Sequence, residues 1–118
     1  MKARVVAIFS PDVDVASHPP SDPADDGLAL TMYVGPEDGP GHESFDLVVC
    51  TPRWLERVVR DQAGPLVGRH YLIVEAMDLE RVLAFLREQV ETAQAPTWSE
   101  LASIVGRLGR WEFEDYRA

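Results

Sequence analysis

Hydrophobic and polar residues alternate along this chain with a period of two in some segments and of about 3.6 in others. The period of each segment predicts whether it forms a strand or a helix. A period of two predicts strands over residues 3–9, 28–34 and 43–50, because successive side chains of a strand point to opposite faces. Residues 69–75 are apolar on both faces, which is typical of a strand inside a sheet. Residues 111–116 alternate aromatic with acidic side chains, and we expect a short strand or an extended edge segment there.

A period near 3.6 predicts three helices in the second half of the chain. Thr51 can cap the first helix, Asp78 the second and Thr97 the third, since each offers a side-chain oxygen to the amides of a first turn. The first helix is short, and we expect Trp54 to be a buried core anchor on its apolar face. The second helix covers residues 79–92 and carries one apolar stripe.

Two polar segments separate these elements. Residues 10–27 hold four prolines and five aspartates, and we expect a mobile acidic loop that is too polar and too broken by proline to pack. Residues 35–41 are rich in glycine and proline, which predicts a hairpin turn between the strands over 28–34 and 43–50.

The resulting order is β-β-β-α-β-α-α with a short C-terminal strand. It predicts an α+β fold in two layers, with a mainly antiparallel sheet of about four strands and the helices on one face. We expect one domain over residues 1–118, because the chain shows no linker or repeat and is long enough to bury a core. The single cysteine, Cys50, excludes an internal disulfide and fits a reducing cytosol. No apolar run approaches the ~20 residues of a membrane span, and the amino end lacks the apolar region of a signal peptide.

Charge is distributed unevenly. The net charge is −9, and the segment from Val5 to Pro52 holds nine acidic residues and no lysine or arginine. Such a field repels nucleic acid and anionic membranes, and it speeds the encounter with a basic protein. An acidic surface also improves solubility, and charge alone favours that simpler explanation.

Cys50 is the candidate nucleophile, with His18, His42 or His70 as its base. Nucleophilic catalysis requires a base within hydrogen-bond reach and a thiol of lowered pKa, and the dipole of the following helix would favour a thiolate. A free cysteine on an apolar strand is more commonly a small buried hydrophobe. We therefore expect Cys50 to be structural, and rapid iodoacetamide labelling below neutral pH would contradict that.

Other groups of residues lack the spacing or the charge that a metal, phosphate or nucleic-acid site requires. Asp12, Asp14 and His18 lack the ligand ladder of a calcium loop, and the glycines of residues 35–41 match no phosphate-binding pattern. The three tryptophans could stack on bases, but nucleic-acid binding requires a basic face. We expect no metal, no cofactor and no nucleic acid.

The acidic segments and the aromatic–acidic tail form the candidate binding surface. Aromatic anchors ringed by carboxylates suit a protein partner that presents arginine and lysine. The alternative is an edge strand protected by charge. The candidate partner-binding residues are Asp22, Asp25, Asp26, Glu37, Asp38, Glu43, Glu112, Glu114, Asp115 and Tyr116.

Four blocks of the chain resemble, in order, a known family. They are Ser44-Phe-Asp-Leu-Val-Val-Cys-Thr-Pro-Arg-Trp-Leu55, Gly68-Arg-His-Tyr-Leu-Ile-Val-Glu75, Thr97-Trp-Ser-Glu100 and Gly106-Arg-Leu-Gly-Arg-Trp-Glu-Phe-Glu-Asp-Tyr116. They are similar to the immunity protein 8 family of bacterial polymorphic-toxin and contact-dependent-inhibition systems. The resemblance covers residues 28–118, and the insert at 10–27 has no counterpart in these blocks.

The resemblance implies a cytoplasmic, non-catalytic protein that binds a toxin domain made by its own cell or by close kin and blocks it by direct occlusion. It gives no contact residues. Many such toxins are nucleases with basic faces, so an acidic inhibitor would suit a basic partner. The alternative is an adaptor or regulatory domain of the same fold that binds another basic protein. A small cysteine-dependent enzyme is a third hypothesis, and it requires a pocket that places Cys50 near His70.

Overall fold

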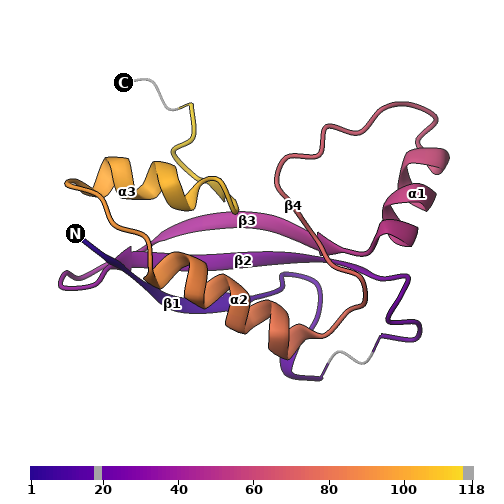
Figure 1. Ribbon diagram of the computed structural model, residues 1–118, viewed down its shortest axis with the longest axis horizontal. Coiled ribbons are helices and arrows are strands. Elements are labelled where there is room, and N and C mark those ends of the chain that lie inside the picture. The colour runs from indigo at the N-terminus through magenta and orange to yellow at the C-terminus, as the bar shows by residue number, and fades with distance from the viewer. Residues whose placement is uncertain (18–19, 116–118) are drawn as a thin grey trace.

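The computed structural model describes residues 1–17 and 20–115, and within them it shows an α+β domain (Figure 1). One sheet contains the strands β1 (Ala3–Phe9), β2 (Gly27–Pro36), β3 (Glu43–Cys50), β4 (Tyr71–Ile73) and β5 (Arg110–Trp111). The helices are α1 (Pro52–Asp61), α2 (Leu79–Glu91) and α3 (Trp98–Val105), together with a 3-10 turn, η1 (Val15–Ser17). The predicted fold class and element order are confirmed.

The sheet is mainly antiparallel, in the order β1-β2-β3-β4. β2 and β3 form the predicted hairpin, with Leu30 opposite Leu47 and Met32 opposite Phe45. The other side of β3 is shared by two short strands. β5 pairs with its first half in antiparallel fashion, and β4 pairs with its second half in parallel fashion.

The hydrophobic core lies between one face of this sheet and two helices. The buried side chains of β2 and β3 occupy alternate positions, because alternate residues of a strand share a face. α2 and α3 cover that face with a stripe of buried residues each, as the 3.6 period predicts. The stripes are Val82, Leu86 and Val90 in α2 and Leu101, Ala102 and Val105 in α3.

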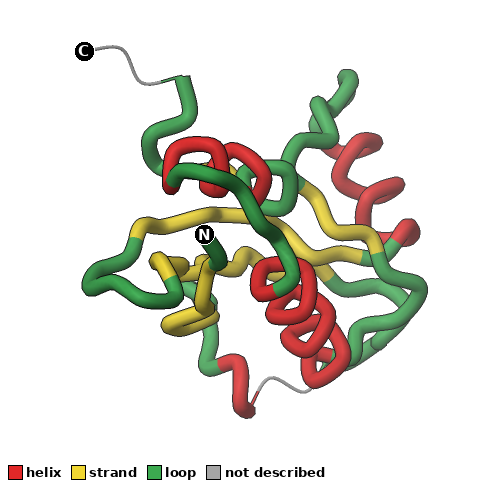
Figure 2. The backbone as a smooth tube through the Cα atoms, turned by 60° about the vertical axis from the view of Figure 1, so that its left-hand side comes forward, coloured by secondary structure: helices red, strands yellow, loops and turns green. Residues whose placement is uncertain are grey.

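Helix α1 stands apart from this packing. Figure 1 shows it beyond the end of the sheet, and the turned view of Figure 2 again separates it from α2 and α3. Thr51 caps it as predicted, because the threonine side-chain oxygen accepts a hydrogen bond from the N–H of Trp54. None of the ten residues of α1, all of which are described, is fully buried, so the prediction of Trp54 as a buried anchor is wrong. Amphipathic spacing shows which face of a helix is apolar, but not whether the core reaches it.

The segment at 10–27 contacts the rest of the molecule more closely than predicted. Val13 and Val15 pack against the core, and the N–H of Met77 donates to the carbonyl oxygen of Pro23 over 2.6 Å. The expectation that this segment is too polar to pack is therefore wrong. Val13 and Val15 lie among the aspartates and pack the first half of the segment against the core.

β4 differs from the prediction for residues 69–75. Only Tyr71–Ile73 is a strand, and it pairs with β3 alone, so it lies at an edge and not inside the sheet. Leu72 packs against the core, whereas Ile73 is 56% exposed. The apolar run predicted two buried faces, but only one of them is covered.

The C-terminal tail also departs from its expected extended form. β5 ends at Trp111, and residues 112–115 form a turn. The alternation of aromatic and acidic side chains thus predicted a short strand at the right place but overestimated its length.

Candidate functional site

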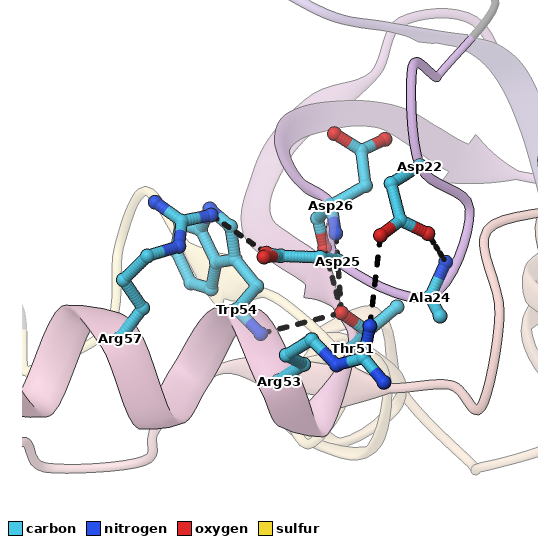
Figure 3. A network of polar contacts seen from close by, with 8 residues as sticks. All are labelled: Asp22, Ala24, Asp25, Asp26, Thr51, Arg53, Trp54 and Arg57. Atoms are coloured by element: carbon cyan, nitrogen blue, oxygen red, sulfur yellow. Dashed lines mark hydrogen bonds and ion pairs between the residues drawn. The ribbon is translucent and has the colours of Figure 1, made fainter.

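The first group of candidate acids is held against the start of α1 (Figure 3). The buried side-chain oxygen of Thr51 accepts hydrogen bonds from two backbone N–H groups, those of Trp54 at 3.4 Å and Asp26 at 3.1 Å. The N–H of Thr51 donates to the carbonyl oxygen of Asp26 over 3.0 Å. One threonine therefore caps the helix and fixes the end of the acidic segment at the same time.

Two aspartates of this group pair with arginines of α1 (Figure 3). Arg57 Nη2 lies 2.6 Å from Asp25 Oδ1, and Arg53 Nη1 lies 3.6 Å from Asp22 Oδ2. The hydrogen bond to Asp25 raises the pKa of the Arg57 guanidinium. These carboxylates are thus partly neutralised within the chain. One feature of the sequence indicates that these two arginines face the same partner segment: they lie one helical turn apart.

The second group lies in the turn between β2 and β3, where Glu37 and Asp38 are exposed. The backbone of this turn is supported by Arg4, whose guanidinium donates to the carbonyl oxygens of Pro36 and Gly39 over 3.2 and 3.4 Å. The two carboxylates therefore project from a braced turn into solvent.

Glu43 has a different role in the structure. Its half-buried carboxylate accepts hydrogen bonds from the indole N–H of Trp98 at 2.7 Å and of Trp111 at 3.1 Å. Because these tryptophans belong to α3 and β5, one side chain of β3 connects three elements. Both indoles thereby find the polar partner that a buried tryptophan normally requires.

The third group lies in the C-terminal turn. Glu112 Oε1 accepts a hydrogen bond from the N–H of Ser44 over 3.0 Å, and Glu114 Oε1 accepts one from Arg69 Nη2 over 3.2 Å. Asp115 is exposed, and Tyr116 lies outside the described residues. The nine candidates that the structure describes thus lie at the start of α1, in the turn between β2 and β3, at Glu43 and in the C-terminal turn, and not at one site.

A hollow beside Glu114 was missed by reasoning from the sequence. It has a volume of about 690 Å³ and lies between residues 67–71, the end of α3 and the C-terminal turn. His70 borders it with only 7% of its side chain exposed, and its Nε2 lies 3.3 Å from Glu114 Oε1 without hydrogen-bond alignment. No local pattern could predict this cluster, since 45 residues separate Arg69 from Glu114.

Cys50 is the buried hydrophobe that the sequence favoured. Its side chain is fully buried, and burial raises the pKa of the thiol to about 11. At neutral pH the sulfur therefore keeps its proton and is a poor nucleophile. The two hollows that His70 borders are lined by other residues of the described chain, and Cys50 does not face either of them.

The described residues place no group of three or more histidine, cysteine, aspartate or glutamate side chains where they could hold a metal ion. His18, one of the predicted candidates for such a cluster, lies outside them. Within the same part of the chain, every helix is too short or too polar to cross a membrane.

Comparison with known families gives one match. The sequence model of the family described as Immunity protein 8 matches residues 3–116, which include the insert at 10–27 that the four resembling blocks left out. No curated protein and no solved structure matches the chain.

Proposed function

The chain belongs to the immunity protein 8 family, and from this premise we propose that it binds a cognate toxin domain and neutralises it by direct occlusion. The family match over residues 3–116 is the observation that carries the proposal. The protein would act in the cytoplasm and without catalysis, by covering the surface that the toxin needs. The buried, protonated thiol of Cys50 is consistent with a binding role.

The toxin partner would be basic, and a nuclease is the class that fits best. The support is the net charge of −9, because an acidic inhibitor attracts a basic domain and competes with the phosphates of its substrate. Among the candidate residues, Glu37, Asp38 and Asp115 are exposed and have no ion-pair partner within the described chain. These three are the first positions at which we expect charge to guide the toxin.

A second candidate function uses the same charge and the same fold. An adaptor or regulatory domain would bind a basic protein that is not a toxin. Gene context separates the two hypotheses, since an immunity gene should lie beside a gene for a large multidomain toxin. A cysteine-dependent enzyme would require Cys50 to become accessible, for which the fully buried side chain gives no support.

Co-expression tests the proposal directly. The C-terminal domain of the neighbouring large protein should kill cells when expressed alone and be harmless when this protein is also present. The variant Leu86→Asp is the matched control, because a carboxylate at a fully buried position prevents folding and should abolish protection. Cell death in the presence of the folded, expressed wild-type protein would end the immunity hypothesis.

A further inference from the structure

We propose that the groove between β4 and the first half of α2 is where the toxin is anchored. It would receive an extended toxin segment that carries apolar side chains flanked by lysine or arginine. This inference rests on the proposed immunity function and adds the surface and the chemistry of the bound segment. Three features of the groove support it: its apolar lining, its unpaired strand edge and its acidic rim.

The lining of the groove is the first feature. The groove has a volume of about 520 Å³ and lies between residues 72–76 and the side chains of Val82 and Phe85. Two of its residues are large and exposed, Ile73 at 56% and Phe85 at 43%. Exposed aliphatic and aromatic side chains gathered in one concave place are typical anchors of a protein interface.

The outer edge of β4 is the second feature. The N–H of Val48 donates to the carbonyl oxygen of His70, and the N–H of Val74 donates to that of Cys50. Because residues of a parallel strand bond alternately to either side, the backbone groups of Tyr71 and Ile73 point away from β3. Within the described chain no backbone or side-chain group bonds to them on that side. An extended segment of another protein can pair with such an edge.

The charge at the rim is the third feature, and it selects the partner. Glu75 and Asp78 are exposed carboxylates that line the groove. Arg81 is the only cationic residue of the described chain that lines the groove, and its Nε lies 3.6 Å from Asp78. Among the described residues, Glu75 therefore has no ion-pair partner in the groove. A bound segment with lysine or arginine beside its apolar residues would complement this rim.

The hollow beside His70 is less suited to a basic segment. It is bordered by Arg69 and Arg107 as well as by Glu114 and Asp115, so its lining carries no excess of negative charge. The groove beside β4 thus combines apolar anchors with a negative rim, and the hollow does not.

Truncation of the anchors tests the proposal. The probe is the purified C-terminal domain of the toxin encoded beside this gene, and the measurement is its Kd by titration calorimetry. Phe85→Ser should weaken binding by about tenfold or more, the loss expected when an interface anchor is removed. Val59→Ser is the matched control, since Val59 is 39% exposed on α1 and does not line the groove, and it should change the Kd by less than about twofold.

Proline tests the strand edge separately. Ile73→Pro removes an N–H that points away from β3, so the pairing of β4 with β3 remains while an added strand loses a donor. We expect weaker toxin binding with an unchanged melting temperature. Because Ile73 is also an apolar anchor, the control is Ile73→Ala, which removes most of the side chain but keeps the N–H, and Ile73→Pro should bind the toxin more weakly than Ile73→Ala does. If Ile73→Pro lowers the melting temperature, Phe85→Ser alone decides the test.

The outcomes separate this inference from the proposed function. If the wild-type protein neither binds nor protects against the toxin, the immunity proposal fails. If the wild-type protein binds and folded Phe85→Ser binds equally well, the groove inference fails and the immunity proposal stands. A toxin-free dimer that Phe85→Ser converts to a monomer would assign the groove to a second copy of the chain and overturn the inference.

Discussion

The indole ring of Trp54 lies against the backbone of Gly27 so closely that a β-carbon at position 27 would overlap the ring. This contact joins α1 to the start of β2 at the end of the sheet, where the helix has no fully buried residue. The Thr51 cap and the ion pair between Asp25 and Arg57 hold the same junction (Figure 3). This close ring contact and these polar bonds therefore help to hold α1 in place.

Gly27→Ala should lower the free energy of unfolding by about 1–3 kcal/mol, because the added methyl forces the ring or the helix to move. Urea denaturation measures the effect. Gly68→Ala is the control, since a β-carbon there meets nothing within 4 Å, and it should be neutral within about 1 kcal/mol. The cost of Gly27→Ala should also shrink in a Trp54→Ala background, where the overlapping ring is absent. Equal costs in both backgrounds would contradict the contact.

Trp54→Ala should lower the free energy of unfolding by less than the replacement of a core tryptophan by alanine does. A fully buried tryptophan replaced by alanine typically costs ~3–5 kcal/mol. Because the indole is half-buried and outside the core cluster, we expect about half of that loss. A melting curve like that of the wild type would show that the ring contributes nothing to the fold, and α1 would then become a candidate interface.

Glu43→Ala should be more destabilising than any other alanine substitution among the candidate acids. It removes the acceptor of two indole N–H groups and should cost about 1–3 kcal/mol. Glu37→Ala is the matched control on the same hairpin, and as an exposed side chain it should stay within about 0.5 kcal/mol. Glu43→Gln keeps one acceptor oxygen and should lie between them. If the first two substitutions have equal effects by urea denaturation, Glu43 does not connect the three elements in solution.

Local patterns predicted the elements whose partners are close in sequence. The alternation of Leu28 to Val34 placed β2 and its buried face correctly, and the caps Thr51, Asp78 and Thr97 were all found at helix starts. Both sets of features depend on period and on side chains within one turn, which a sequence displays directly.

Predictions failed where the deciding partner is distant in the chain. The carboxylate of Asp25 looked free because Arg57 lies 32 residues away, and Trp54 looked buried because the pattern cannot say whether a core reaches α1. The apolar run of β4 likewise predicted that both of its faces are buried, but the side chain of Ile73 is exposed. Each failure concerns tertiary placement, and that of β4 lies at the groove where binding is proposed.

The thiol of Cys50 should make stability depend on alkaline pH. Burial raises its pKa from 9.0 to about 11, so between these values the native state keeps a proton that the unfolded state has released. The free energy of unfolding should therefore fall as the pH rises through this window, and Cys50→Ala should lack that part of the decline. The native thiol should also react with iodoacetamide only as fast as the protein unfolds. Rapid labelling of the folded protein would show that Cys50 is accessible and would reopen the enzyme hypothesis.

The salt dependence of toxin binding should distinguish two proposed contributions of this surface. These are electrostatic guidance by the exposed carboxylates and anchoring by the apolar side chains of the groove. Raising the salt from ~50 to ~500 mM shortens the screening length from about 14 Å to about 4 Å, so association with a basic toxin should slow by about tenfold or more. Exposed carboxylates act mainly on the association rate, and buried anchors act mainly on the dissociation rate. Neutralising Glu37 and Asp38 together as Glu37→Gln and Asp38→Asn should thus slow association, whereas Phe85→Ser should speed dissociation, both measured by stopped flow. Association that is indifferent to salt would contradict electrostatic guidance by the acidic surface while leaving the apolar groove as the main contact.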